Sequence, residues 1–337
     1  MKNHIKVDKK SAEKEIRKLK VEEWIDYDYK IQDIGKYLLI PLKDNVNSEK
    51  LWTFEIVQES GIRNERRINP LRISGSYDTI GSIVVTKESD PVKLMQLSRN
   101  LLNSGKGIRS VYRDRGVRGK ARLRDLELVL GEDNKKTLYK ENGITLNVDI
   151  SRAYFSPRLA TERFLLANRV KDGEIIIDMF AGIGPFSILI ASMRDVDIIA
   201  IDSNPEAISL LNDNIKINRL RGRIIPVIGD SALIMRNYPK ADRIIMNFPT
   251  GAFQFIDAAV EQLKDGGRID YYEIASYEEI AIRMDHFRDM GLIAEAKREV
   301  HAYSKSLRMF SIELLKKTAN GMATIGQNNI RSLDKVK

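Results

Sequence analysis

The sequence predicts an α/β fold in which a doubly wound, mostly parallel sheet occupies the second half of the chain, preceded by two smaller α+β domains. From residue 148 onward, short apolar runs alternate with helical patterns, which is typical of strand–helix–strand units around a parallel sheet. The run EIIIDMF at 174–180 is apolar almost throughout, as expected of a strand buried on both faces. A chain of 337 residues is long enough to give each region its own core.

The first predicted domain covers residues 1–70. Its segment KKSAEKEIRKLKVEEWI, at 9–25, has helical periodicity, and two short strands are expected around Gly35. A polar stretch at 58–76, interrupted by glycine and proline, predicts a linker after this domain.

The second predicted domain covers residues 75–147, with a helix at 90–105 and strand-like segments that turn at Gly131 and Gly143. The third covers 148–316 and contains the parallel sheet. Its strands are expected at 174–180, 197–202, 223–230, 241–249 and 267–275, with helices at 185–193, 205–218 and 253–263. Residues 317–337 are polar and predict a flexible tail.

The amino-acid composition excludes several kinds of functional site. The chain has no cysteine, which excludes disulfides, thiolate zinc sites and cysteine nucleophiles, and its three scattered histidines argue against a histidine metal cluster. No apolar run approaches the roughly 20 residues needed to span a bilayer, and the N-terminus lacks the apolar segment of a secretory signal. We therefore expect no membrane contact and a cytoplasmic protein. The net charge of +9 favours a polyanionic partner.

A glycine turn follows the first strand of the parallel sheet. Asp178 ends that strand, and Gly182 and Gly184 open the next helix, so the backbone can approach a ligand closely. The third glycine of a dinucleotide-binding fingerprint is missing, because Ser187 occupies its position. The turn therefore departs from a nicotinamide-binding pattern.

Two further acids end the next strands. Asp202 is placed to bind ribose hydroxyls, and Asp230 to accept a hydrogen bond from the amine of adenine. The alternative is that these acids cap the following helices, and this alternative is stronger for Asp230. Three carboxylates would repel a pyrophosphate but not a cationic sulfonium. The set therefore favours S-adenosyl-L-methionine over NAD or FAD.

The fourth strand ends in Asn247-Phe248-Pro249-Thr250. In a nucleoside pocket of this kind the corner faces the transferred group, and Pro249 stiffens it so that the Asn247 amide can be aimed at a planar nitrogenous target. An incidental Asn-x-Pro loop is the equally weighted alternative.

A basic segment lies upstream of the sheet. Residues 109–124 contain seven basic side chains against one acid, with Tyr112 among them, which suits phosphate contacts and stacking on a base. A solvated basic face is the alternative. Further on, Glu162 lies on a predicted helix beside Arg158 and Arg163, and the local pattern favours an ordinary intrahelical ion pair.

These segments together resemble one family. VDISRAYFSPRLATER, DMFAGIGPFSI, MNFPTGAFQFIDAA and GGRIDYYE are similar to segments of the archaeal and eukaryotic tRNA (guanine-37-N1)-methyltransferases, which have a class I, Rossmann-like methyltransferase domain. The resemblance extends to KKSAEKEIRKLK and DYDYKIQDIGKYLLIPL near the N-terminus, and to RDRGVRGKARLRDLELVLGE in the middle. It covers the chain to about residue 316.

The resemblance implies roles for individual residues. Glu162, in the Ser-Pro-Arg-x-x-x-Glu motif, matches the proposed general base, and Arg122 matches the arginine that donates to guanine O6. Tyr154 matches an aromatic residue near the target nucleotide, while Asn247 and Pro249 match the corner that positions the base. The implied cofactor contacts are Asp178, Phe180, Gly182, Gly184, Asp202, Asp230 and Asn247. The expected RNA contacts are Arg113, Arg115, Arg118, Lys120, Arg124 and Arg158.

The implied reaction is methylation of N1 of guanosine 37 in tRNA. The N-terminal domain is implied to hold the outer corner of tRNA and the middle domain to bind the anticodon stem-loop. The resemblance suggests a monomer and assistance by Mg²⁺, although no residue pattern indicates either. Archaeal members commonly have leucine where this chain has Phe248, and a second activity on wyosine intermediates stays open.

Three alternatives remain. The aminocarboxypropyl transferase of wyosine synthesis uses the same cofactor, although SPRLATER and NFPT favour methyl transfer. A non-catalytic tRNA-binding relative comes from a different class, and a dehydrogenase is more distant.

Overall fold

The computed structural model describes residues 1–22, 24–44, 46, 54–62, 77–118 and 123–318. The chain forms two compact units, Met1–Ser74 and Gly75–Lys337. Most of the linker expected at 58–76 and nearly all of the tail expected from 317 lie outside the described residues.

The N-terminal unit is an antiparallel sheet with one helix. Its strands are β1 (Lys2–Asp8), β2 (Gln32–Ile34), β3 (Tyr37–Pro41) and β4 (Glu55–Glu59), in the order β2-β3-β1-β4. Helix α1 (Ala12–Val21) supplies Leu19 to a core that includes Ile5 and Ile40. The helix and the two strands around Gly35 are where the sequence pattern predicts them, whereas β1 and β4 were not foreseen.

The second unit begins with a four-stranded sheet of β5 (Tyr77–Ile80), β6 (Ile83–Thr86), β7 (Ser110–Arg118) and β8 (Leu123–Gly131). Strands β6 and β7 are parallel, and helix α2 (Pro91–Leu102) connects them. The helix starts where the side chain of Asp90 accepts a hydrogen bond from the Lys93 N–H at 2.8 Å, with Pro91 as first helical residue.

A hairpin of β9 (Lys136–Glu141) and β10 (Ile144–Asp149) joins this region to the large sheet. Helix α5 (Pro205–Ile217) holds strand β10 through two asparagines. Asn214 on the helix accepts a hydrogen bond from the Asn147 N–H, and Asn218, just beyond the helix, accepts one from the Thr145 N–H. One hydrophobic core contains residues of the four-stranded sheet, the hairpin and the large sheet. The boundary predicted at 147/148 therefore does not separate two packing units.

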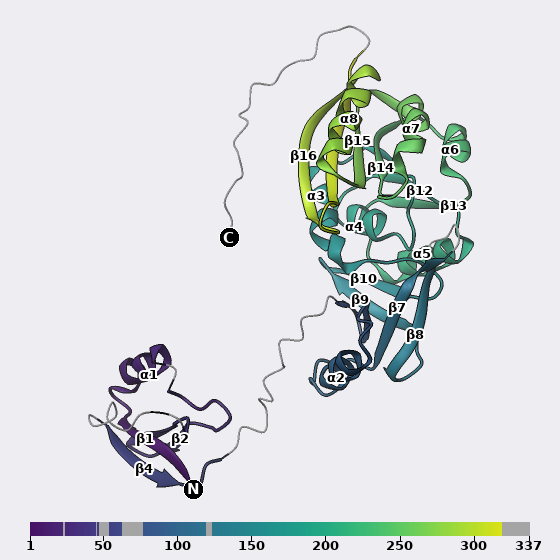
Figure 1. The fold of residues 1–337 in the computed structure, drawn as a ribbon. Helices are drawn as coiled ribbons and strands as arrows, with labels where there is room; N and C mark the ends of the chain where they lie inside the picture. Colours follow the sequence, from purple (N-terminus) through teal and green to yellow (C-terminus); the bar gives the residue numbers. More distant parts are fainter. Residues whose placement is uncertain (23, 45, 47–53, 63–76, 119–122, 319–337) are drawn as a thin grey trace. The chain divides into compact units, whose positions relative to one another are not determined.

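The large sheet has seven strands in the order β13-β12-β11-β14-β15-β17-β16. Figure 1 shows its outer strands β13 and β16 on opposite sides of this domain. Strands β11 to β15 are parallel, and β17 is antiparallel to both β15 and β16. The strands are β11 (Ile175–Asp178), β12 (Asp197–Asp202), β13 (Arg223–Ile228), β14 (Ala241–Met246), β15 (Leu263–Ala275), β16 (Leu292–Ala302) and β17 (Arg308–Lys316). The predicted doubly wound α/β architecture is confirmed.

The helices around this sheet are α3 (Ala160–Arg169), α4 (Pro185–Met193), α5, α6 (Ser231–Ile234), α7 (Ile256–Gln262) and α8 (Tyr277–Asp289), with short 3₁₀ turns at Pro157–Leu159, Met235–Asn237 and Ala252–Phe255. Neighbouring residues of β11 enter different cores: Ile176 belongs to one buried cluster and Ile177 to the other. This explains why the strand is apolar at consecutive positions. Within the described ranges, every helix is too short or too polar to cross a bilayer.

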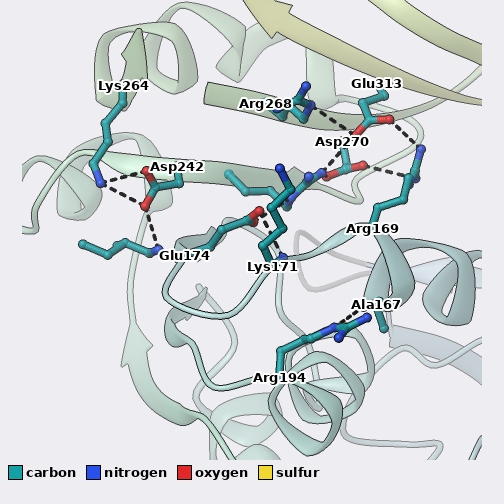
Figure 2. Close-up of polar contacts among 12 residues, drawn as sticks. Ala167, Arg169, Lys171, Glu174, Arg194, Asp242, Lys264, Arg268, Asp270 and Glu313 are labelled. Atoms are coloured by element: carbon teal, nitrogen blue, oxygen red, sulfur yellow. Dashed lines mark hydrogen bonds and ion pairs between the residues drawn. The ribbon is translucent and has the colours of Figure 1, made fainter. Parts of the chain in front are cut away.

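A buried ion network lies toward the amino ends of these strands. Arg243 is 3% exposed, and its guanidinium contacts Asp270 at 2.7 Å, Glu174 at 3.0 Å and Glu313 at 3.2 Å. Figure 2 shows Asp270 and Glu313 facing Arg169 as well. Burial alone would lower the pKa of Arg243, but the charges of Asp270 and Glu174 raise it above its ordinary value. A cavity of about 400 Å³ beside the network is lined by ion-paired side chains such as Lys264 and Arg268.

We expect Arg243→Met to lower the free energy of unfolding by about 3–5 kcal/mol, because it leaves buried carboxylates without their partner. The matched control is Arg268→Met, since Arg268 is 35% exposed at the rim of the same network. It is expected to cost less than about 1 kcal/mol. Urea denaturation measures both. Equal losses in the two variants would contradict a stabilising role for the buried network.

Candidate active site

The carboxyl ends of four parallel strands meet at one edge of the large sheet. Asp178 ends β11 and pairs in register with Ala200 of β12 and Ile245 of β14. Asp202 ends β12 opposite Ile228 of β13. Asp230 is the second residue after β13, and Asn247 is the first after β14. The topology therefore brings together the polar residues that the sequence placed at strand ends.

The two glycines of the turn after β11 have different functions. Gly184 has φ +83°, and a Cβ there would lie 2.2 Å from Leu211, so this glycine allows α4 to pack against α5. Gly182 has φ +55°, and the nearest atom to an added Cβ is the Tyr154 carbonyl oxygen at 3.9 Å. Its amide donates to Asp202 at 2.8 Å. Only Gly182 therefore leaves open space above the turn.

Asp178 is a buried carboxyl group, and one of its two oxygens has no hydrogen-bond partner among the described residues. It is 1% exposed, and Oδ2 accepts a hydrogen bond from the Ser187 hydroxyl at 2.7 Å. Oδ1 is buried and makes no hydrogen bond to any described residue. Burial raises the pKa of Asp178 to about 7, with a smaller contribution from the charge of Asp202. A donor or cation arriving at Oδ1 would satisfy this carboxylate.

The raised pKa predicts a pH-dependent stability of the ligand-free protein. The folded state binds the Asp178 proton more tightly than the unfolded state, so this contribution is fully present below about pH 4 and is lost as the pH rises through 7. Relative to Asp178→Asn, the wild type should lose on the order of a few kcal/mol between pH 4 and pH 8. Asp197→Asn, at the exposed start of β12, is the control. Parallel curves for wild type and Asp178→Asn in urea titrations would contradict the assignment.

Asp202 and Asp230 differ in burial. Both oxygens of Asp202 accept backbone hydrogen bonds, from Gly182 and from Asn204, each at 2.8 Å. Burial also raises the pKa of Asp202. Asp230 is exposed and accepts from the Ala232 N–H at 3.0 Å, as the N-cap of α6. Asp230 therefore caps a helix, as the alternative interpretation of this residue predicts.

The corner after β14 holds a second unsatisfied oxygen. Asn247 Oδ1 is buried and accepts no hydrogen bond from the described part of the chain. The carbonyl of Pro249 accepts from the Ile274 N–H at 2.7 Å, which fixes the corner to β15. Phe248 packs against Phe180, with ring centroids 5.1 Å apart. The corner is therefore rigid and presents an acceptor without a protein donor.

Glu162 does not form the intrahelical ion pair that its local pattern favoured. Arg163 instead contacts Glu141 of β9 at 2.6 Å, and Arg158 contacts Asp78 of β5 at 2.6 Å. Glu162 is 2% exposed, and its Oε1 accepts a hydrogen bond from Arg298 of β16. Its Oε2 is buried with no partner among the residues described. The predicted ion pair is wrong, and the true partner lies 136 residues away.

The strand register relates Glu162 to the corner after β14. Arg298 of β16 donates to Glu162, and along the sheet Arg298 pairs with Ser311 of β17, which pairs with Tyr272 of β15. Tyr271, the preceding residue, pairs with Met246, which is followed by Asn247. Glu162 and Asn247 therefore approach the same edge of the sheet.

Tyr154 is an exposed aromatic residue near the glycine turn. It is 45% exposed, its carbonyl lies near the open side of Gly182, and the guanidinium of Arg124 stacks 5.1 Å from its ring centroid. Its ring is accessible to a planar ligand.

The basic segment is less exposed than its composition suggests. The side chain of Arg124 is 6% exposed; it is paired with Asp114 at 2.9 Å and donates to the Phe155 carbonyl at 3.1 Å. It is a structural ion-pair residue, so its assignment as an RNA contact is corrected. Tyr112 is fully buried and its hydroxyl donates to Asp133 at 2.9 Å, so it is not available for stacking. Strand alternation turns these residues inward, which a count of charges does not reveal.

The other residues expected to contact RNA are either partly exposed or lie outside the described part of the chain. Arg115 is 50% exposed and pairs with Glu127 at 2.6 Å, and Arg113 lies 3.9 Å from the same carboxylate. Arg158 is 46% exposed. Lys120, Arg122 and the side chain of Arg118 lie outside the described part of the chain. Across the described ranges, no three His, Asp or Glu side chains converge to hold a metal ion.

The chain is similar to known proteins over most of its length. Residues 137–314 match the description "TRM5/TYW2 methyltransferase domain" and residues 5–50 match "tRNA methyltransferase 5 N-terminal domain". The tRNA (guanine(37)-N(1))-methyltransferase Trm5b of Pyrococcus abyssi is 38% identical over 74% of this chain and 77% of its own length. The Trm5b of Methanocaldococcus jannaschii is 36% identical over 83% of this chain and 89% of its own length.

A solved structure shows a similar fold in the presence of RNA. It is described as the complex of aTrm5 and tRNALeu, and it has a TM-score of 0.74 and 32% sequence identity. The similarity covers 93% of this chain and 99% of that chain.

Proposed function

Because the chain belongs to the TRM5/TYW2 methyltransferase family, we infer that it transfers a methyl group from S-adenosyl-L-methionine to N1 of guanosine 37 in tRNA. The N-terminal match at residues 5–50 favours this reaction over aminocarboxypropyl transfer, because that match is described as part of tRNA methyltransferase 5. The observation that carries the inference is a pair of buried acceptors, Glu162 Oε2 and Asn247 Oδ1, which both lack a described donor at the carboxyl edge.

The cofactor fits the residues that end β11 and β12. Asp178 offers an unsatisfied carboxylate oxygen, and Gly182 leaves open space beside Asp202. We assign the methionine end to the glycine turn and Asp178, the ribose to Asp202, and the adenine to the surface near Asp230 and Phe180. S-adenosyl-L-methionine, when bound, supplies an electrophilic methyl group on a sulfonium. The described residues offer no comparable cluster for Mg²⁺, so we assign no step to a metal.

The protein groups activate the guanine. Its N1 carries a proton and is a poor nucleophile until that proton leaves. Glu162 Oε2 accepts this proton, and the electron pair of the N1–H bond stays on the base, where it is shared between N1 and O6. Asn247 Oδ1 accepts from the exocyclic amine, which adenine lacks at that position. Arg122, outside the described residues, stays the predicted partner of O6, and Tyr154 the predicted stacking partner of the nucleotide.

The RNA is bound by other parts of the chain in this proposal. The N-terminal unit contacts the outer corner of tRNA, and the surface that carries Arg113, Arg115 and Arg158 contacts the anticodon stem-loop. The aTrm5–tRNALeu complex supports tRNA as the partner. We propose that the enzyme acts as a monomer in the cytoplasm.

The test is a reaction of the protein with an unmodified tRNA transcript and methyl-labelled S-adenosyl-L-methionine. Labelled tRNA together with S-adenosylhomocysteine is expected. Methylthioadenosine as the cofactor product would instead indicate aminocarboxypropyl transfer. Binding of tRNA without any cofactor turnover would indicate a non-catalytic relative.

A further inference from the structure

Arg298 contacts the carboxylate of Glu162 in the structure, and no sequence motif indicated it. It lies on β16, and its Nη2 donates to Oε1 of Glu162 on α3. Along the ladder Arg298 pairs with Ser311 of β17, and Ser311 pairs with Tyr272 of β15. Arg298 therefore lies level with Tyr272, beside the edge where the base is expected.

The two members of this pair differ in exposure. The side chain of Glu162 is 2% exposed, whereas that of Arg298 is 45% exposed. A buried carboxylate without a cation is costly and tends to take up a proton, and a protonated carboxyl group cannot accept another from guanine. Arg298 supplies the missing cation while its own charge keeps contact with solvent. It occupies only Oε1, so Oε2 stays open.

We propose that Arg298 is a positioning residue for methyl transfer, which holds Glu162 through Oε1 in the ionised form with Oε2 aimed at N1 of the guanine. The proposal rests on the proposed function. In the step, the N1–H bond breaks, its proton forms a bond to Oε2, and its electron pair remains on the base. Oε1 keeps its hydrogen bond from Arg298 throughout, so the carboxyl group does not rotate away.

Other charged groups near Glu162 do not replace Arg298. His301, also on β16, is partly buried, and burial together with Arg158 lowers its pKa, so the ring is neutral at pH 7. Arg158 is paired with Asp78. Tyr272 on β15 is uncharged, because burial raises the pKa of its hydroxyl. Arg163 on the same helix is paired with Glu141.

Two other roles for Arg298 predict different results. A residue that only tied α3 to β16 would change the unfolding temperature and leave the pH dependence of the reaction unaltered. A residue that contacted a tRNA phosphate would raise KM for tRNA at every pH. A positioning residue instead changes the single-turnover rate constant, and changes it most at low pH.

The test compares Arg298→Gln, Arg298→Lys and wild type in single-turnover methyl transfer to tRNA transcripts between pH 6 and pH 9. Without the charge of Arg298 the buried carboxylate is more costly, so the acid limb of the Gln profile, where the rate falls with pH, should lie at higher pH than that of wild type. The rate constant of the Gln variant should be about tenfold or more below that of wild type at pH 6, and it should approach the wild-type value toward pH 9. KM for tRNA and Kd for S-adenosyl-L-methionine should stay within about twofold, because Arg298 has no part in either contact. Arg298→Lys keeps the charge and should keep the wild-type acid limb, at a several-fold lower rate because a lysine lacks the rigid fork.

His301→Asn is the matched control on the same strand and should keep the wild-type acid limb. The proposal is overturned if Arg298→Gln has the wild-type profile, or if its only defect is a raised KM for tRNA. If Arg298→Gln does not fold, Arg298→Lys provides the test. The proposal is then overturned if the acid limb of Arg298→Lys differs from that of wild type, or if its rate equals that of wild type. A failure of the proposed function is distinct, because wild type would then transfer no methyl group to guanosine 37, whatever residue occupies position 298.

Discussion

Replacing Glu162 with glutamine is expected to lower the rate constant for methyl transfer about 10²–10⁴-fold, the usual contribution of a positioned general base. Glutamine preserves the size of the side chain but cannot take up the N1 proton. The affinity for S-adenosyl-L-methionine should stay near that of wild type, because the residues assigned to the cofactor end β11 and β12 or lie in the turns after β11 and β13, not on α3. Single-turnover transfer of labelled methyl groups measures the rate, and calorimetry measures the affinity.

The matched control is Glu261→Gln. Glu261 also forms an ion pair with an arginine, Arg236 at 3.1 Å, but it is 64% exposed and lies on α7. Its replacement should leave the rate unchanged. If Glu162→Gln transferred methyl groups as fast as Glu261→Gln, Glu162 would have no part in proton removal.

The second large effect is expected at Asp202, where alanine should weaken binding of S-adenosyl-L-methionine by at least about 10²-fold, because hydrogen bonds to a charged group contribute about 1.5–3 kcal/mol each. The loss includes an indirect part. Asp202 also accepts from the Gly182 N–H at 2.8 Å, so its removal loosens the turn that faces the methionine end.

Asp197→Ala is the control for this experiment, since Asp197 begins the same strand at the opposite edge and pairs there with Arg223. Titration calorimetry with ligand-free protein gives both dissociation constants without any need for catalysis. A dissociation constant for Asp202→Ala equal to that of Asp197→Ala would place the cofactor elsewhere.

The parallel sheet and its polar edge were predictable because both depend on local patterns. A strand buried on both faces must be apolar at consecutive positions, and Ile176 and Ile177 meet this requirement in two different cores. Acids at the ends of such strands are brought together by the topology alone. This is why the sequence alone predicts that Asp178 and Asp202 lie at one edge.

The features that the sequence did not predict depend on contacts between residues far apart in the chain. Strand β1 has only two apolar residues, Ile5 and Val7. Its Lys2 is buried in an ion pair with Asp26, which no local pattern shows. Tyr112 and Arg124 lie in a segment whose charge suggests a surface, yet both side chains are buried in the four-stranded sheet of β5 to β8. Arg298 and Glu162 are 136 residues apart, so their pairing follows only from the position of β16 beside α3.

The most direct test of the central claim, that the carboxyl edge places the methyl donor beside N1 of guanosine 37, is to locate the methyl group in transcripts that differ only at position 37. Mass spectrometry of nuclease fragments should find the label on N1 when guanosine occupies position 37. Inosine, which retains N1–H and O6 but lacks the amine assigned to Asn247, should react more slowly, and adenosine should not react. Equal labelling of all three transcripts, or a methyl group on another atom of guanosine 37, would contradict the account.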